Sequence, residues 1–124
     1  VEDTARGHLL AMERGKVGII NPDVVKCGGL TEAKKIAALA QACSKQIVPH
    51  NTKPTFSTAA SLHFAASISN CGAFMEFVDV DEFTDLMNLM KNNVEFKDGF
   101  LLVPQKAGIG IEPDEERLKR AVIA

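Results

Sequence analysis

Short apolar runs alternate with longer helix-like stretches along most of this chain. Three runs are brief, mostly apolar and bounded by turn residues, so they are predicted to be buried strands: 17–20, 46–49 and 74–78. Five stretches are predicted to be helices from their apolar spacing, capping residues or small-residue content: 4–14, 31–43, 57–67, 81–91 and 112–122. The segment 96–111 is punctuated by glycine and proline and is predicted to form short extended pieces.

The order of these elements indicates a parallel sheet. Alternating helices and strands are typical of α/β folds, and a parallel sheet needs cover on both faces. Three strands alone would also leave two open edges, which either partner chains or residues before Val1 must close. We expect the second arrangement, an α/β fold that is the C-terminal part of a larger barrel. Residues 1–80 would form a partial β/α barrel, and residues 81–124 the last barrel helix and a C-terminal tail.

A charged or titratable residue stands at or near the end of each predicted strand. Asp23, His50 and Glu76 are 27 and 26 residues apart, close to the roughly 31 residues of one strand–helix unit in an eight-fold barrel. The C-terminal ends of barrel strands surround one mouth, where these folds carry out their chemistry. The spacing therefore predicts that the three side chains converge at one site.

A histidine beside a carboxylate is suited to proton transfer. The carboxylate orients the imidazole and stabilises its protonated form, which makes the pair a natural general base. Asp23 is the partner that we expect for His50; the alternative is that it only caps an Asn-Pro-Asp turn. Glu76 lies in an apolar run, so it is either a protonated donor to a developing oxyanion or an outward-facing strand residue. Lys26 either reaches into the mouth or pairs with a neighbouring carboxylate.

Length, charge and cysteine content exclude several classes of protein. The 124 residues fall in the range of one domain, and the net charge of −2 suggests neither a nucleic-acid nor a membrane partner. No apolar run approaches the about 18 residues of a membrane span. Three cysteines without a CxxC pattern argue against a disulfide framework or a zinc site, and they favour reduced thiols in a cytoplasmic protein.

Six short motifs occur in an order that is more specific than any one of them. They are Asn21-Pro-Asp-Val-Val-Lys-Cys-Gly-Gly29, Thr31-Glu-Ala-Lys-Lys-Ile-Ala-Ala-Leu-Ala40, Val48-Pro-His-Asn51, Ala59-Ala-Ser-Leu-His-Phe-Ala-Ala-Ser67, Met75-Glu76 and, before Gly108-Ile-Gly110, Asp98-Gly-Phe-Leu-Leu-Val-Pro104. With them the chain resembles the C-terminal portion of the mandelate racemase/muconate lactonizing enzyme family, in the enolase superfamily, over nearly its whole length. The resemblance implies a (β/α)7β TIM-type barrel, of which this chain supplies strands six to eight with flanking helices. It also implies a C-terminal tail that returns to an absent capping domain.

The resemblance implies a role for each candidate residue. His50, ending strand seven, matches the base of the racemase-like subgroup. Asp23, ending strand six, matches the acid that is paired with this base. Glu76, on strand eight, matches the residue that donates a hydrogen bond to the enolate. Lys26 and Asn51 are expected to contact the substrate.

Magnesium is the cofactor that the resemblance implies. Members of the family bind Mg²⁺ through three carboxylates on barrel strands three, four and five, and the metal stabilises the enolate as a Lewis acid. Two of these ligands must precede Val1, and Glu2 is the candidate for the third.

Abstraction of the proton α to a carboxylate is therefore the expected reaction. Many members with the His–Asp pair are sugar-acid dehydratases, so we expect a Mg²⁺-dependent acid-sugar dehydratase that acts on a small carboxylate. A racemase, epimerase or cycloisomerase of the same family is the alternative. The whole enzyme is expected to be a homo-oligomer that includes an N-terminal part, without which this chain is expected to be inactive. The hypothesis of another class is a truncated, non-catalytic remnant.

Overall fold

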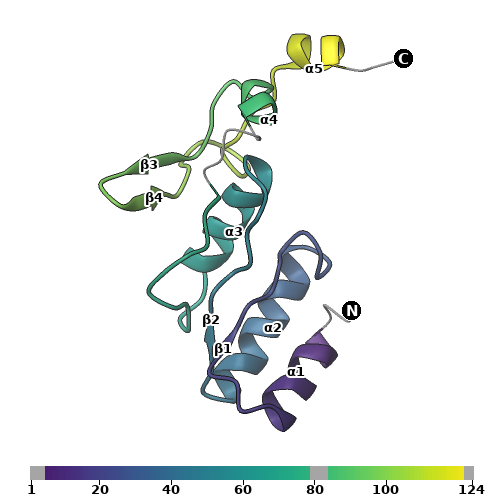
Figure 1. Ribbon diagram of the computed structural model, residues 1–124, viewed down its shortest axis with the longest axis vertical. Helices are drawn as coiled ribbons and strands as arrows, with labels where there is room; N and C mark the ends of the chain where they lie inside the picture. Colours follow the sequence, from purple (N-terminus) through teal and green to yellow (C-terminus); the bar gives the residue numbers. More distant parts are fainter. Residues whose placement is uncertain (1–4, 79–83, 122–124) are drawn as a thin grey trace.

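The computed structural model describes residues 5–78 and 84–121 and shows an elongated molecule (Figure 1). Its helices and strands are, in order, α1 (Ala5–Arg14), β1 (Ile19–Ile20), α2 (Leu30–Ala42), β2 (Gln46–Ile47), α3 (Phe56–Ala66), α4 (Thr84–Asn88), β3 (Glu95–Lys97), β4 (Phe100–Leu102) and α5 (Glu115–Ala121). Helices α1 and α2 lie beside β1 and β2 at one end, and α4 and α5 lie at the other, with α3 between them. Among the helices of the described residues, none is long and apolar enough to cross a membrane.

Strands β1 and β2 form a parallel ladder, as the alternation of helices and strands predicts. The paired residues are Ile19 with Gln46 and Ile20 with Ile47. Backbone pairing continues past the strands, because His50 N donates to the Pro22 carbonyl at 3.0 Å and Asp23 forms an isolated parallel bridge with His50. Every pair keeps the same offset along the chain, so one register runs from the strands to the candidate site.

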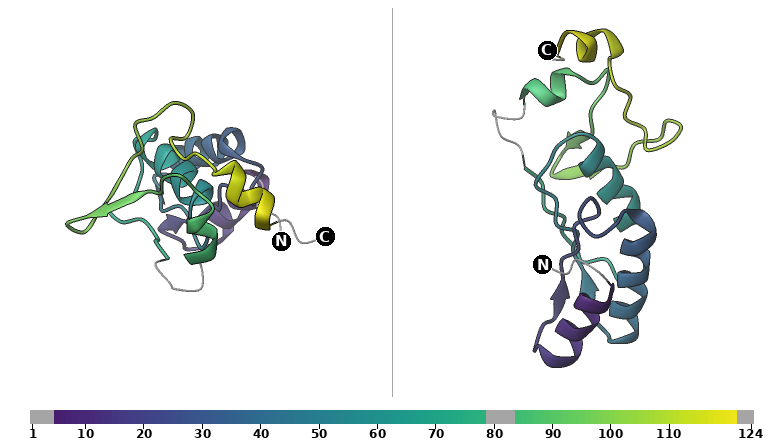
Figure 2. Two further views of the ribbon diagram at one scale, coloured as in Figure 1. Left: turned by 90° about the horizontal axis from the view of Figure 1, so that it is seen from above. Right: turned by 90° about the vertical axis from the view of Figure 1, so that its right-hand side faces the viewer.

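One face of this short sheet is buried and the other is open. Ile20 and Ile47 point into the core, whereas Ile19 and Gln46 on the opposite face are exposed. Such alternation is the period-two pattern of a strand whose two faces differ in cover. Helices α1 and α2 pack on the buried side (Figure 2).

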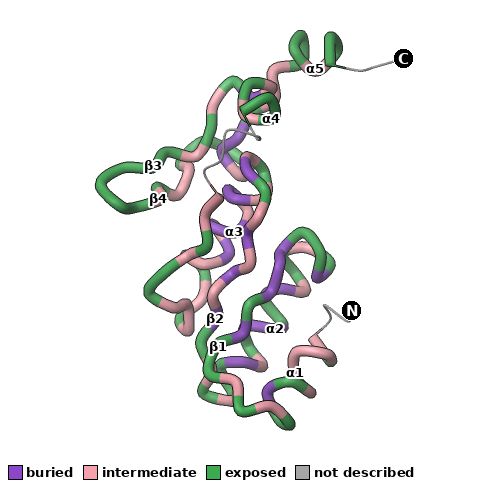
Figure 3. Tube along the Cα trace, in the orientation of Figure 1, coloured by how far each residue is buried: buried purple, intermediate pink, exposed green. Residues whose placement is uncertain are grey.

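Helix α2 presents a row of small and apolar residues to the strands. The buried positions recur at i, i+3, i+4 and i+7: Ala33, Ile36, Ala37 and Ala40. Alanine side chains let the helix approach closely, and Phe64 of α3 fills the remaining space in the same core. Figure 3 shows this buried band running through α2, the strands and α3.

The predicted third strand, 74–78, is not formed. Pairing with β2 is limited to one parallel bridge between Cys71 and Ile47, with Gly72 N donating to the Ile47 carbonyl at 2.7 Å. From Ala73 to Val78 the chain is extended without a ladder. Among the described residues no strand lies on the far side of this segment, and a strand bonded to one neighbour at one point is only marginally stable.

The helix predicted over 81–91 ends earlier in the structure, at Asn88 of α4 (Thr84–Asn88), whereas residues 81–83 of the prediction lie outside the described residues. The chain then turns and bonds to a distant segment, since Lys91 N donates to the Glu112 carbonyl at 2.8 Å. The last helix likewise begins at Glu115 rather than at residue 112. These non-local backbone bonds take the place of the helical ones at both boundaries.

The segment 96–111 forms short extended pieces, as predicted. Strands β3 and β4 make an antiparallel hairpin around Asp98 and Gly99, which both have positive φ angles as a tight two-residue turn requires. The tail returns to α3, where His63 Nε2 lies 3.2 Å from the Ile109 carbonyl. A small second core lies at this contact and contains Ala59, Met90 and Ile111.

Candidate active site

Asp23 lies at the end of the ladder, where the chain enters a turn over residues 24–29. Its Oδ1 atom accepts the backbone N–H groups of Val25 at 2.9 Å and Lys26 at 3.2 Å, as an aspartate at a turn commonly does. The residue is buried, so this bonding holds the carboxyl group in one orientation. The second oxygen, Oδ2, is left for other partners.

His50 is one partner of this second oxygen. Its Nδ1 atom lies 3.0 Å from Oδ2 of Asp23, which agrees with the contact predicted from the strand spacing. Because the two residues continue the parallel register, a slip of one residue would place Pro22 or Val24 opposite His50 instead. Asp23 therefore does more than cap the turn: Oδ1 accepts the turn N–H groups and Oδ2 faces the histidine.

The carboxylate decides which ring nitrogen carries the proton. An ionised carboxylate can only accept hydrogen bonds, so Nδ1 of His50 is the donor. The other nitrogen, Nε2, then has its lone pair free. Within the described residues no other side chain hydrogen-bonds this ring, which is partly exposed. Such an arrangement is chemically able to act as a general base.

Lys26 brings a positive charge to the same carboxylate. Its Nζ lies 3.3 Å from Oδ2 of Asp23, so of the two alternatives for Lys26 the structure shows the ion pair. Desolvation by burial is the largest influence on the pKa of Asp23 and raises it. The hydrogen bonds from His50, Lys26 and the two turn N–H groups together outweigh burial and hold this pKa below its usual value. Asp23 is therefore ionised at neutral pH.

Glu76 reaches the same end of the sheet by a different route. Its Oε2 atom accepts the backbone N–H of Asn51 at 2.9 Å, and the Asn51 side-chain amide donates to the Glu76 carbonyl at 3.3 Å. Because Asn51 directly follows His50, Glu76 is attached one residue from the candidate base. Glu76 is exposed, which agrees with the outward-facing alternative, although its segment forms no strand.

Two residues of this network were missed by the sequence reasoning. Ser57 Oγ donates to Asn51 Oδ1 at 3.1 Å, and Asn51 Nδ2 donates to Thr58 Oγ1 at 3.0 Å. Both hydroxyls belong to the first turn of α3. The sequence does show two hydroxyl residues shortly after the Val48-Pro-His-Asn51 motif. They did not point to the site, because hydroxyl residues are common at the start of any helix, where they act as caps.

The structure thus brings five of the six predicted site residues to one end of the parallel ladder: Asp23, Lys26, His50, Asn51 and Glu76. The sixth residue, Glu2, lies outside the described residues. Substrate contact by Lys26 and Asn51 stays a prediction.

The described residues do not fit a magnesium site by themselves. In the ranges 5–78 and 84–121, no three His, Cys, Asp or Glu side chains gather as metal ligands would. Asp23, the buried carboxylate of the site, has N–H donors on both of its oxygens. A hard cation needs several free oxygens, and this donor set does not offer them.

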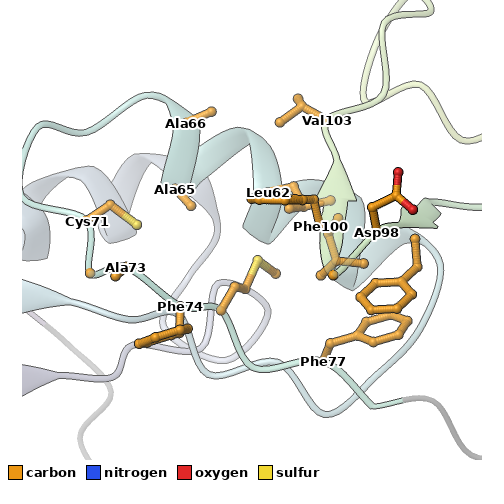
Figure 4. A pocket seen from close by; sticks show the side chains of 15 residues that line it. Leu62, Ala65, Ala66, Cys71, Ala73, Phe74, Phe77, Asp98, Phe100 and Val103 are labelled. Carbon is orange, nitrogen blue, oxygen red and sulfur yellow. The ribbon is translucent and has the colours of Figure 1, made fainter.

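A cavity of about 590 Å³ opens beside the segment that carries Glu76. Its lining is mainly apolar and comes from α3, the β3–β4 hairpin and residues 71–77, with Phe77 stacked on Phe96 at 5.8 Å between ring centroids (Figure 4). Met75 and Phe77 line this cavity, whereas Glu76 between them bonds to the end of β2. The cavity is therefore separate from the candidate active site.

Fold, motifs and site together define a class of protein, and comparison with known families agrees. The model of the enolase C-terminal domain-like family matches residues 2–117. The chain therefore belongs to this family, and the resemblance identified from its motifs is confirmed. Its mixed α/β architecture is that of part of an enolase C-terminal domain.

Curated relatives carry the name D-galactonate dehydratase. The protein of that name from Xanthomonas axonopodis pv. citri is 35% identical over 111 residues, which cover 86% of this chain and 29% of the relative. The one from Cronobacter sakazakii is 34% identical over 112 residues, with the same coverage. The chain thus spans less than a third of the length of these relatives.

Solved structures give the same assignment. A putative dehydratase from Salmonella enterica serovar Typhimurium superposes with a TM-score of 0.86 at 25% identity, covering 98% of this chain and 30% of that one. A mandelate racemase/muconate lactonizing enzyme from Sulfitobacter sp. superposes with a TM-score of 0.81 at 37% identity, covering 95% and 28%.

Proposed function

We propose that this chain carries the proton-transfer side of the active site of an acid-sugar dehydratase. The observation that carries the proposal is the 3.0 Å contact between Nδ1 of His50 and Oδ2 of Asp23 at the open end of the parallel ladder. The name of the curated relatives, D-galactonate dehydratase, supports a sugar acid as the substrate class. The reaction begins with removal of the proton α to the substrate carboxylate.

His50 acts first as a base and then as an acid. Its Nε2 lone pair takes the α-proton, and the electron pair of the broken C–H bond forms an enolate. When the C–O bond at the β-carbon breaks, the proton on Nε2 passes to the departing hydroxyl, which leaves as water. The enol that remains tautomerises to a 2-keto acid. Asp23 stabilises the imidazolium through both steps and keeps the Nδ1 proton in place.

Glu76 supports the charge that develops on the substrate. Its Oε2 is bonded to Asn51 N, whereas within the described residues Oε1 has no hydrogen-bond partner. A proton on Oε1 can be donated to the enolate oxygen. A donor that is already oriented toward the developing charge lowers the barrier more than one that must reorient.

Several further properties belong to the whole protein and are proposed with it. Mg²⁺ and its carboxylate ligands, with Glu2 as one candidate, lie outside the residues that the structure describes. An N-terminal part of the protein completes the barrel and supplies the capping domain, with residues 1–80 as barrel and 81–124 as last helix and tail. The enzyme is a cytoplasmic homo-oligomer. Lys26 contacts the substrate from the mouth of the barrel.

A racemase is the second candidate, because several structural neighbours are named mandelate racemase/muconate lactonizing enzymes. In that reaction the enolate is reprotonated and the β-hydroxyl stays. The non-catalytic remnant is the alternative of another class. The two enzymatic candidates differ in product, and the remnant differs from both in producing none.

The test uses the complete polypeptide that contains this sequence, incubated with Mg²⁺ and a panel of sugar acids that includes D-galactonate. Formation of a 2-keto acid supports a dehydratase, and inversion at the α-carbon supports a racemase. We expect His50→Asn to abolish exchange of the substrate α-proton with solvent deuterium. His63→Asn, which changes a histidine on α3 bonded to the tail, is the matched control and should retain exchange. Exchange at the parental rate in His50→Asn would remove this residue from the mechanism.

A further inference from the structure

We propose that Asn51 is a positioning residue that sets the place of Glu76 beside His50. This inference rests on the proposed function, in which Glu76 stabilises the developing charge. It also gives Asn51 a role different from the substrate contact that the sequence suggests. The segment that carries Glu76 lacks a strand ladder, and Asn51 makes the bonds that a ladder would have made.

The Asn51 side chain is closed off from any substrate. The residue is 1% exposed, and both polar atoms of its side chain have partners within the protein. Nδ2 donates to Thr58 Oγ1 at 3.0 Å and to the Glu76 carbonyl at 3.3 Å, and Oδ1 accepts from Ser57 Oγ at 3.1 Å. A buried amide with both ends satisfied is well suited to fix the groups around it.

Asn51 binds Glu76 at two points, one on the backbone and one on the side chain. The amide Nδ2 holds the Glu76 carbonyl, and the backbone N–H of Asn51 holds the Glu76 carboxylate through Oε2 at 2.9 Å. Two contacts from one residue define the direction of the Glu76 side chain as well as its position. Because His50 precedes Asn51, this geometry is transmitted to the base through a single peptide bond.

Asn51 is itself fixed by hydrogen bonds to the first turn of α3. Thr58 is buried, and its hydroxyl accepts from Asn51 while it donates to the Lys53 carbonyl at 3.0 Å. The loop between His50 and α3 is thereby closed on itself. The only backbone pairing of the Glu76 segment with β2 lies five residues earlier, at Cys71, so within the described residues Asn51 is its anchor near the site.

The experiment compares Asn51→Leu with a matched control, Asn70→Leu, in the complete polypeptide. Leucine has the same number of side-chain heavy atoms as asparagine and the same branching at Cγ but no polar atoms, and it leaves the backbone N–H of residue 51 in place. Asn70 also joins two segments, since its Nδ2 donates to the Ala37 and Lys45 carbonyls, both at 3.1 Å, but it does not touch Glu76. We expect kcat to fall about 10- to 100-fold in Asn51→Leu, as small displacements of catalytic groups do, with KM nearly unchanged.

A double-mutant cycle with Glu76→Gln separates positioning from general destabilisation. If Asn51 acts through Glu76, Asn51→Leu should lower kcat less than about 2-fold once Glu76 is already changed. The same loss in both backgrounds would overturn the proposal. A rise in KM with kcat preserved would also overturn it and would return Asn51 to substrate binding.

Hydrogen exchange gives a readout that does not depend on activity. We expect the backbone amide of residue 51, which is bonded to Glu76 Oε2, to lose protection in Asn51→Leu and to keep it in Asn70→Leu. If the protein turns over no sugar acid, the proposed function fails, yet unchanged protection would still overturn the positioning role separately. Should Asn51→Leu not fold, Thr58→Val removes one partner of Nδ2 and should lower kcat about 2- to 10-fold, as expected for one hydrogen bond.

Discussion

Replacing Asp23 with asparagine tests the proposed mechanism at a single atom. The side chain keeps Oδ1 for the turn N–H groups of Val25 and Lys26, but it places an NH2 group where Oδ2 faces Nδ1 of His50 at 3.0 Å. The reverse orientation of the amide would set that NH2 group against both turn donors instead. His50 must therefore give up its Nδ1 proton and carry the proton on Nε2. The nitrogen that should take the substrate proton is then already occupied.

The size of the effect follows from the share of the barrier that a general base lowers. Such a base contributes about 10²–10⁴-fold, which corresponds to about 2.7 to 5.4 kcal/mol at about 1.36 kcal/mol for each factor of ten. We expect α-proton exchange and turnover to fall together by this factor in Asp23→Asn. KM should change much less, because Asp23 acts on the reaction through His50.

Asp114 provides an unusually close control. Its Oδ1 also accepts the N–H groups two and three residues ahead, those of Glu116 and Arg117, both at 3.1 Å. A cationic side chain three residues ahead again binds Oδ2, with Arg117 Nε at 3.2 Å. The local geometry matches that of Asp23 except for the histidine, and Asp114 lies at the far end of the molecule, next to α5 (Figure 1). Asp114→Asn should change exchange less than about 2-fold.

The assay is the loss of the substrate α-proton signal in deuterated buffer, followed by NMR across a range of pH. An exchange rate in Asp23→Asn close to the parental rate, with an unaltered pH profile, would refute the pairing as the source of basicity. A drop of equal size in Asp114→Asn would show instead that loss of a carboxylate charge at such a turn disturbs the whole protein.

Replacing Asp23 with asparagine should also change how the stability of the protein depends on pH in acid. The pKa of Asp23 is lower in the folded protein than in the unfolded chain, so its stabilisation is fully present above the unfolded value of about 3.9. This contribution is lost as the pH falls through the folded pKa. The parent should therefore unfold less readily than Asp23→Asn at pH 7, and the difference should shrink below about pH 4 in urea titrations at each pH.

Two further predictions concern packing. Phe64→Ala should lower the free energy of unfolding by about 3–5 kcal/mol in urea titrations, because Phe64 is 1% exposed, whereas Phe100→Ala, at a residue 70% exposed, should have a much smaller effect. Equal losses in the two variants would contradict the core assignment. Gly110→Ala should lower the free energy of unfolding by about 1–3 kcal/mol more than Gly99→Ala does. Both glycines have positive φ, but only at Gly110 would an added Cβ lie 2.3 Å from Pro104 Cβ. Matching melting temperatures for these two variants would show that the contact with Pro104 relaxes freely.

The Asp23–His50 contact was predictable because few parameters decide it. Once two strands are parallel and neighbouring, one register determines every pair, and the apolar residues that must face the core select that register. Ile20 and Ile47 satisfy this condition together, and the same offset carries Asp23 to His50. The sequence contains both strand ends, so the contact could be inferred from spacing alone.

The course of residues 74–78 was not predictable in the same way. The run Phe74-Met-Glu-Phe-Val78 has the composition of a strand, but a strand also needs neighbours with backbone groups to bond. Pairing stops after the bridge at Cys71, and the link to β2 passes to the side chain of Asn51. A bond between a side chain and a distant carbonyl leaves no periodic trace in the sequence. Helix α4 also ends earlier than predicted because of non-local bonds: the residues that follow it form backbone hydrogen bonds with the C-terminal tail.

The bonding of the carboxylates explains which half of an active site this chain can supply. Asp23 has N–H donors on both oxygens and a low pKa, so it is a fixed negative charge that serves a neighbouring imidazole. Glu76 has one oxygen bound to Asn51 N and the other without a partner in the described residues, which suits a single directed hydrogen bond. A cation such as Mg²⁺ instead requires carboxylates whose oxygens converge without competing N–H donors. The hydrogen bonds that suit Asp23 to orient His50 therefore make it a poor metal ligand, and the Mg²⁺ that we propose would need other carboxylates.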